Sequence, residues 1–234
     1  WAGARSGSLL KIYDSKVLNN IATNEGGGFY LIQSTNKIEL NDILINGNSS
    51  AKKGGGIFVT GAKPTIKSSL ITGNQSESGG AIYIQNSTAE LSLINTIFYD
   101  NKITSNGSVI YGNNQATVKM YHSTISNNSA PEKSTLYLNS GSSIYLYNSI
   151  LCSNEASKQV IFGNDGATAG RFEAKASIIE GLTTIQISDN QDIVSIDNTS
   201  FSTNPFFTNP NFNDFTLKNN SPAIGYGTND VSFS

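Results

Sequence analysis

The sequence predicts an all-β fold, a right-handed single-stranded parallel β-helix (solenoid) of about eight coils, each about 27 residues long with three short strands. Two recurring blocks predict it. A turn that ends in asparagine and a small-residue turn followed by alternating apolar residues return in phase along the chain. Composition agrees, because glycine, asparagine, serine and threonine are abundant and only 14% of the residues are charged, which is typical of a chain rich in strands and turns.

Asparagine ends the first block in six successive copies. They are Asn20, Asn48, Asn74, Asn101, Asn128 and Asn154. These residues lie 28, 26, 27, 27 and 26 positions apart, and the less regular copies ASIIEGL and NTSFSTN continue the series. Amides stacked on one turn hydrogen-bond to one another and to the turn backbone, so we expect a structural asparagine ladder. His122, the single histidine, falls in a second column of turn residues, which favours a structural role over that of a catalytic base or metal ligand.

The second block carries an aromatic residue at one position of six successive coils. These residues are Tyr30, Phe58, Tyr83, Tyr111, Tyr137 and Phe162. Successive strand side chains point to opposite faces, so inward aliphatic neighbours place the rings outside, about 4.8 Å apart. Two interpretations follow: ring stacking strengthens the sheet, or a stripe of aromatic faces binds carbohydrate. The sequence favours the first, and this column is the candidate binding site for the second.

The runs within each coil are too short to fold alone. The third run supplies the most uniform apolar column, formed by Val17, Ile45, Ile71, Phe98, Ile125 and Leu151. An isolated coil cannot bury such a face, whereas stacked coils bury it continuously. Crossovers between parallel strands are almost always right-handed, which predicts the hand of the helix. The alternative, a pair of antiparallel β-sandwiches, predicts irregular spacing and repeated Asn-Gly hairpins.

Charge and composition lower the expectation for several function classes. A net charge of −2 and a pI of about 5.4 provide no attraction for nucleic acid. No apolar run is long enough to span a bilayer, so direct membrane insertion is not expected. Cys152 is the single cysteine, which leaves neither an intramolecular disulfide nor a cysteine-based metal site to expect.

The outward column of the second run offers no evident catalytic cluster. Its members are Lys11, Glu39, Thr65, Ser92, Lys119, Tyr145 and Glu173. We expect Lys11 and Glu39 to pair across coils. We expect the same of Glu25 and Lys53 beside the glycine turns. Isolated exposed pairs of this kind contribute little, and we predict no catalytic residues.

Calcium is the one candidate cofactor. Asp165, Asp189 and Asp192 lie in the loops 162–170 and 188–198. Calcium needs six or more converging oxygen atoms, and Asp/Asn/Gly loops are more often plain turns. We therefore expect no metal site and no cofactor.

The blocks GGGIFV (54–59) and GGAIYI (79–84) resemble the parallel β-helix repeats of the pectin-lyase-like superfamily. GGAI (79–82) and FYDN (98–101) are similar to repeats of the polymorphic outer-membrane-protein type. Segment 204–230 resembles the closing segment of choice-of-anchor bacterial surface proteins. The residues that fit this pattern are Pro205, Phe207, Asp214, Phe215, Leu217, Ser221, Pro222, Ala223, Ile224 and Gly225. The resemblance implies a secreted or cell-surface, extracellular bacterial protein.

The same superfamily holds lyases, hydrolases and non-catalytic adhesins and stalks, so the resemblance indicates the fold and leaves the function open. The chain departs from the lyases, because it contains no Asp-Asp segment, no G-H-G block and only two arginines, Arg5 and Arg171. We expect a non-catalytic surface module, an adhesin, stalk or matrix component, whose partner is a glycan or another surface protein. The alternative is a polysaccharide lyase or hydrolase, or its carbohydrate-binding subunit.

Two segments are predicted. Residues 1–204 form the coils, either open at the N-terminal end or, as we favour, continued there by upstream coils or another chain. Residues 205–234 form a C-terminal cap that leads to an anchoring or sorting region, and four phenylalanines are expected to fold over the last coil. These are Phe206, Phe207, Phe212 and Phe215.

Overall fold

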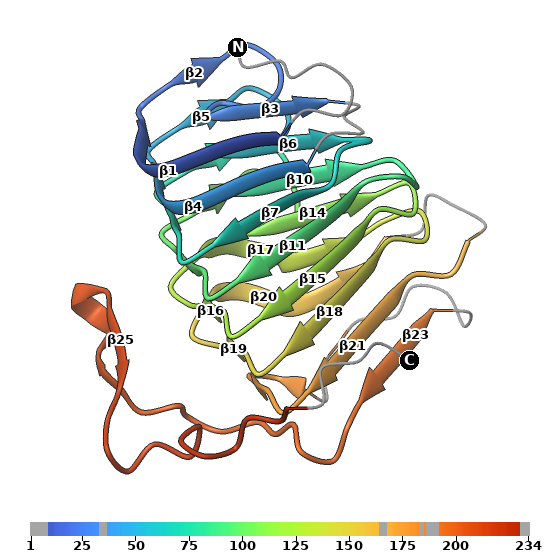
Figure 1. The fold of residues 1–234 in the computed structure, drawn as a ribbon. Coiled ribbons are helices and arrows are strands. Elements are labelled where there is room, and N and C mark those ends of the chain that lie inside the picture. The colour runs from blue at the N-terminus through green and yellow to red at the C-terminus, as the bar shows by residue number, and fades with distance from the viewer. Residues whose placement is uncertain (1–8, 33–36, 164–167, 183–184, 186–191, 230–234) are drawn as a thin grey trace.

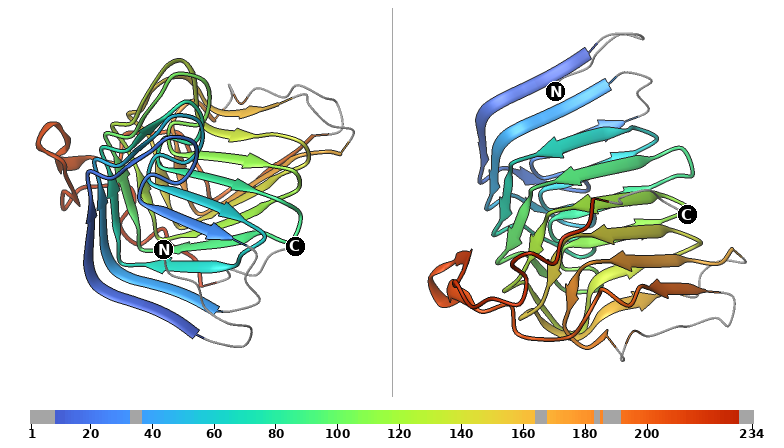
Figure 2. Two further views of the ribbon diagram at one scale, coloured as in Figure 1. Left: turned by 90° about the horizontal axis from the view of Figure 1, so that it is seen from above. Right: turned by 60° about the horizontal axis from the view of Figure 1, so that its bottom comes forward.

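The computed structural model describes residues 9–32, 37–163, 168–182, 185 and 192–229. These residues form a stack of parallel coils (Figures 1 and 2). The fold class is confirmed, but about six turns are present rather than the predicted eight. The predicted seventh and eighth copies keep only part of the strand pattern among the described residues. The bridge between Ile178 and Phe201 marks where the last of them pairs.

The larger sheet has thirteen strands and forms two walls of the stack. One wall contains β7 (Pro64–Lys67), β11 (Glu90–Ile94), β15 (Thr117–Tyr121), β18 (Ser143–Tyr147), β21 (Arg171–Lys175) and β23 (Ile193–Ile196). The other contains β8 (Leu70–Thr72), β12 (Ile97–Tyr99), β16 (Thr124–Ile125), β19 (Ile150–Leu151) and β22 (Ile178–Ile179). The long strands β1 (Leu9–Leu18) and β4 (Lys37–Asn46) bend across both walls, which joins the two walls into one sheet.

The ten-stranded sheet forms the remaining sides. Its main wall contains β3 (Phe29–Ile32), β6 (Ile57–Thr60), β10 (Ile82–Gln85), β14 (Ile110–Asn113), β17 (Ser129–Leu138) and β20 (Glu155–Phe162). Its short strands are β2 (Ile21–Ala22), β5 (Ser49–Ser50), β9 (Gln75–Ser76) and β13 (Lys102–Ile103). Every pair in both large sheets is parallel and joins equivalent positions of consecutive coils, as the pairing of Ile57, Ile82 and Ile110 illustrates.

Left-handed backbone at two corners of each coil explains the abundance of asparagine and aspartate. The residue before each ladder asparagine has a positive φ, for example 55° at Asp100 and 56° at Asn127. A second corner repeats the conformation with φ between 45° and 55°, and the residues there are Asp14, Asp42, Ser68, Asn95, His122, Asn148 and Ala176. Asparagine and aspartate enter this region at lower cost than most other residues with a Cβ atom. His122 is thus a corner residue, as predicted.

The apolar core runs along the axis of the stack. Ile45, Ile71 and Phe98, three successive members of the third-run column, have no exposed surface. The inward residues of the other two walls, such as Ile82 and Leu91, are equally buried and belong to the same cluster. Stacking therefore supplies the burial that no single coil has.

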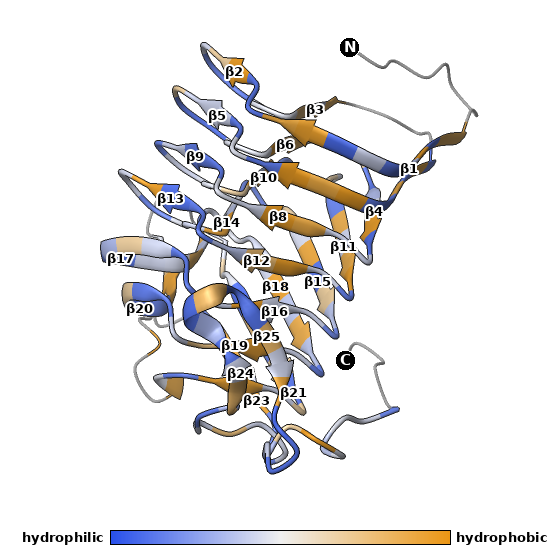
Figure 3. Ribbon diagram, turned by 90° about the vertical axis from the view of Figure 1, so that its left-hand side faces the viewer, coloured by the Kyte–Doolittle hydropathy of each residue, from blue (hydrophilic) through white to orange (hydrophobic). Residues whose placement is uncertain are grey.

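The C-terminal segment lies against the side of the stack and not over its last coil (Figure 3). Strands β24 (Phe207–Asn209) and β25 (Asp214–Leu217) form an antiparallel hairpin around the 3₁₀ turn η2 (Pro210–Phe212). Phe207 and Phe215 pack on Cys152, beside outward apolar residues of β12 and β19. Phe206 and Phe212 are exposed, Phe212 by 82%. The expectation that all four phenylalanines cover the end is wrong, because the apolar outward patch on this wall accepts the hairpin sideways.

The reactivity of the Cys152 thiol measures how well the hairpin covers it. Burial raises the pKa of its thiol to about 11, which keeps it protonated and unreactive at pH 8. We expect Phe215→Ser to increase the rate of reaction with a disulfide reagent about tenfold, because the variant uncovers the sulfur. Phe212→Ser, at an exposed position of the same hairpin, should leave the rate unchanged. Equal rates for wild type and Phe215→Ser would show that the hairpin does not cover the thiol.

Within the described residues, no helix has the length and apolar character of a membrane span.

Candidate functional site

The aromatic column is continuous over five coils. The ring centroids of Tyr30, Phe58, Tyr83, Tyr111 and Tyr137 follow one another at 5.0, 5.7, 4.7 and 4.8 Å. The first three pairs are stacked with interplanar angles of 20°, 17° and 12°, and the fourth is tilted by 37°. The rings therefore face each other along the axis of the stack.

Phe162 does not belong to this column. Tyr137 pairs with Ile161, and Phe162 pairs with Leu138 and lies in the core with 1% exposure. Alternation from Val160, which pairs with Leu136, places residues 160 and 162 on the same inward face. The sequence prediction aligned the Phe162 copy with the Tyr137 copy by their aromatic residues. In the structure, the aliphatic residues that enter the core set the register instead.

Stacking occupies the faces of the inner rings. Phe58 is 1% exposed and Tyr83 is 4% exposed. The Lys53 ammonium lies 5.1 Å from the centroid of the Tyr83 ring and forms the predicted ion pair with Glu25 at 3.4 Å. Burial raises the pKa of Tyr83 to about 12, so its hydroxyl stays neutral. A sugar ring cannot lie flat on these inner rings, which favours the structural interpretation of the column.

The asparagine ladder is a chain of paired hydrogen bonds. The backbone N–H and the Nδ2 group of each asparagine both donate to Oδ1 of the asparagine one coil later, at 3.1 and 3.0 Å from Asn74 to Asn101. The same pair of bonds links Asn20 to Asn48, Asn48 to Asn74, Asn101 to Asn128 and Asn128 to Asn154. Asn154 then donates to Oε1 of Gln159 at 3.1 Å. The amides from Asn48 to Asn154 are buried, and the ladder satisfies backbone groups at the corner, so it serves the fold.

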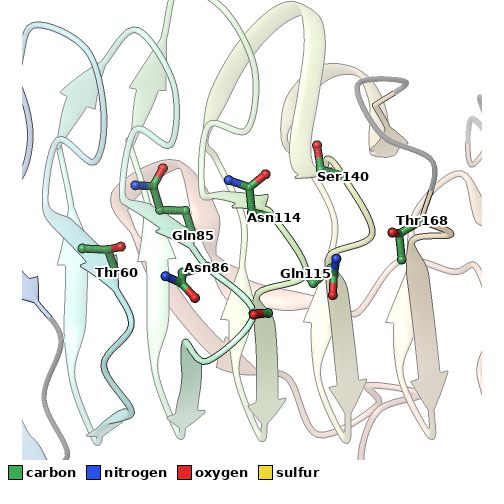
Figure 4. A pocket seen from close by; sticks show the side chains of 8 residues that line it. Thr60, Gln85, Asn86, Asn114, Gln115, Ser140 and Thr168 are labelled. Atoms are coloured by element: carbon green, nitrogen blue, oxygen red, sulfur yellow. The ribbon is translucent and has the colours of Figure 1, made fainter.

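A polar hollow of about 420 Å³ crosses several coils where the strands of the main wall end (Figure 4). We call it the amide groove. It is lined by Thr60, Gln85, Asn86, Ser87, Asn114, Gln115, Ser140 and Thr168. Four of its residues, Asn86, Asn114, Gln115 and Ser140, have positive φ. The turns after β10 and β14 thus present amides to solvent.

The groove residues are uncharged hydrogen-bonding groups. Each amide offers both donors and acceptors, and each hydroxyl offers both as well. Hydrogen bonds of Asn113 connect this region to the aromatic column. Its Nδ2 group donates to the Tyr83 hydroxyl at 3.2 Å, and its Oδ1 atom accepts from Nδ2 of Asn139 at 3.2 Å. Sequence reasoning missed the groove, although the polar residues that follow the alternating run, in IYIQNS and IYGNNQ, were a visible signal.

Residues 4–168 match the family model described as right handed beta helix region. The chain belongs to the right-handed β-helix family. No curated protein and no solved structure matches it significantly. The match confirms the repeat and the hand of the fold, and it concerns the β-helix region alone.

A second cluster in this β-helix lies on the outward face of β18 and β21. Glu173 is 1% exposed. Its Oε2 accepts from Arg171 at 2.7 Å, and its Oε1 accepts from the Tyr147 hydroxyl and lies 3.8 Å from Lys175. Burial and the neighbouring carboxylate raise the pKa of Tyr147, so the phenol remains a donor. We interpret the cluster as an ion-pair network that stabilises the contact between adjacent coils.

Charged residues elsewhere in the β-helix make smaller, local contacts. Lys11 and Glu39 pair at 3.4 Å, as predicted. Among the calcium candidates, Asp192 accepts from the backbone N–H of Gly170 at 2.8 Å, and Asp165 and Asp189 lie outside the described residues. The described part of the chain holds no group of three or more His, Cys, Asp or Glu residues placed to bind a metal ion.

Proposed function

We propose that this β-helix is a non-catalytic carbohydrate-binding module of a secreted or cell-surface protein, and that its ligand is a neutral polysaccharide held in the amide groove. The observation that carries the proposal is the lining of the groove, where amides and hydroxyls of successive coils form a continuous uncharged surface. A neutral sugar polymer offers hydroxyls that match such donors and acceptors. The resemblance of segment 204–230 to closing segments of bacterial surface proteins supports the location.

The repeat geometry favours an extended ligand. Asn86 and Asn114 follow the paired strand ends Gln85 and Asn113 of adjacent coils, so equivalent amides recur at the strand spacing of about 4.8 Å. A polymer that lies along the axis of the stack meets one set of groups per coil. Affinity then accumulates from several weak polar contacts instead of one deep pocket.

Asn114→Gly tests the groove. Glycine removes the amide and keeps the left-handed backbone, which has φ 50° at this position, so the fold is not strained. We expect the affinity for a bound neutral polysaccharide to fall about tenfold in isothermal titration or affinity electrophoresis, because a central polar contact is lost. Asn213→Gly is the matched control: Asn213 is exposed, has φ 59° and lies in the hairpin.

A panel of neutral and anionic polysaccharides completes this test. The proposal expects binding to at least one neutral polymer, little dependence of that binding on salt, and weaker binding to polyuronates. Binding to none of the neutral polymers, or binding that Asn114→Gly leaves intact, contradicts it.

A lyase or hydrolase is the alternative that the resemblance leaves open, but the cluster around Glu173 does not give it an accessible carboxylate, because Glu173 is 1% exposed and both of its carboxylate oxygens are engaged. An enzyme of that kind would release new chain ends from a polysaccharide. The proposal of a non-catalytic module expects no release by the wild-type protein.

A further inference from the structure

The amide groove takes polar groups from consecutive coils and sets them in one row (Figure 4). Thr60 ends β6, Gln85 ends β10, Asn114 follows β14, Ser140 follows β17 and Thr168 lies between β20 and β21. Strand pairing fixes the spacing of this row, because Gln85 pairs with Thr60 in the preceding coil and with Asn113 in the following one. The row therefore advances about 4.8 Å per coil.

The amides at the centre of the row are available to a ligand. The side chains of Gln85, Asn114 and Gln115 form no hydrogen bond with any other residue that the structure describes. Asn86 accepts two hydrogen bonds from Thr88 at its Oδ1 atom, both at 3.2 Å, and its Nδ2 group keeps its donors. A ligand can thus bind these amides without breaking a bond of the fold.

The chemistry of the lining indicates which part of a sugar polymer it contacts. None of the described residues that line the groove is aromatic or charged. Aromatic side chains bind the flat apolar face of a sugar ring, whereas amides and hydroxyls bind the hydroxyl groups at the edge of the ring. The groove is therefore suited to a chain that turns a straight row of hydroxyls towards it.

We propose that the ligand of the amide groove is an extended, neutral β-1,4-linked glycan, bound by its edge with one sugar residue per coil; this inference rests on the proposed function. A residue of a fully extended β-1,4-linked chain is nearly as long as the strand spacing, so its hydroxyls stay in register with the coils. Chains of α-1,4- or β-1,3-linked glucose curve, and their hydroxyls leave the straight row. The stacking of the coils thus selects the linkage of the ligand.

Soluble cello-oligosaccharides of two to six residues test the register. We expect the affinity in isothermal titration calorimetry to rise about threefold with each residue up to the fifth, because each one gains about one net hydrogen bond. It should level off at the sixth residue, since five coils contribute to the lining. Maltopentaose (α-1,4) and laminaripentaose (β-1,3) should bind at least about tenfold more weakly than cellopentaose. An affinity that does not change between two and six residues contradicts the inference.

Thr60→Val gives an independent readout at one end of the groove. It removes a hydroxyl and keeps the β-branched shape that suits a strand. We expect the affinity for cellopentaose to fall about threefold and that for cellotriose to stay unchanged, because a trisaccharide binds to the remaining coils. Thr65→Val, in β7 on another wall, is the matched control and should change neither. An unchanged affinity of Thr60→Val for cellopentaose would show that the ligand does not extend over the row.

The outcomes separate this inference from the proposed function. Tighter binding of maltopentaose or laminaripentaose than of cellopentaose, lost in Asn114→Gly, overturns the β-1,4 register and retains the carbohydrate-binding module. Binding of none of the three oligosaccharide types overturns the inference, and if no neutral polysaccharide binds either, the proposed function falls with it.

Discussion

Gly55→Ala is expected to lower the free energy of unfolding by about 3 kcal/mol. A Cβ atom at position 55 would lie 2.4 Å from the carbonyl oxygen of Gln75 and 2.5 Å from that of Gly80. Both oxygens are backbone atoms of the next coil, and the backbone N–H of Gly55 donates to Gly79 at 3.2 Å. Neither coil can move away without breaking the hydrogen bonds that hold the stack at strand spacing.

Urea unfolding followed by circular dichroism measures this effect. Gly227→Ala is the matched control, because a Cβ atom there would find its nearest neighbour at 3.5 Å, an ordinary contact. The control should stay within about 0.5 kcal/mol of wild type. A Gly55→Ala protein as stable as the control would mean that the coils are not packed as closely as described.

Asn101→Ala is the second large effect, with an expected loss of about 4 kcal/mol. Its Oδ1 atom accepts two bonds from Asn74, and its Nδ2 group donates to the carbonyls of Ile71 and Tyr99 and to Oδ1 of Asn128. Alanine leaves the buried backbone N–H of Asn74 and the carbonyl of Ile71 without these partners. Each buried polar group without its partner costs about 1–3 kcal/mol.

The same unfolding experiment checks this prediction against Asn219→Ala, which removes an exposed amide from a turn. The exposed variant should lie within about 0.5 kcal/mol of wild type. Should Asn101→Ala behave like Asn219→Ala, the ladder would contribute nothing to stability.

The stacking pattern was readable from the sequence because it repeats. A single residue such as Phe98 says little, but its column of apolar counterparts at steps of 26 to 28 residues requires coils of constant length. The corner conformations follow the same logic, since Asp42 and Asn95 recur where left-handed backbone is needed. Features that every coil shares are therefore predictable.

Features that belong to a single coil were not predictable from the sequence. Phe162 was assigned by its aromatic character, and burial of Val160 and Phe162 on the same face decides its place. The position of the C-terminal hairpin depends on the apolar outward patch around Cys152, which forms only when the coils are stacked. The amide groove likewise combines turns of separate coils, so no single sequence motif predicts it.

The burial of the aromatic column has a consequence for binding. Tyr83 is closed in by Phe58, Tyr111 and Lys53, so it offers neither ring face to a ligand. The column supports the wall from which the groove residues project, and Asn113 joins the two through the Tyr83 hydroxyl. We therefore assign the column to the scaffold, and our proposal places ligand recognition in the amide groove.

Titration of isotope-labelled protein with a neutral polysaccharide, followed by nuclear magnetic resonance, tests this assignment most directly. The account predicts that the side-chain amide signals of Gln85, Asn114 and Gln115 shift with ligand and that the ring signals of Phe58 and Tyr83 stay in place. Shifts confined to the aromatic column, or no shift with any neutral polysaccharide, would contradict it.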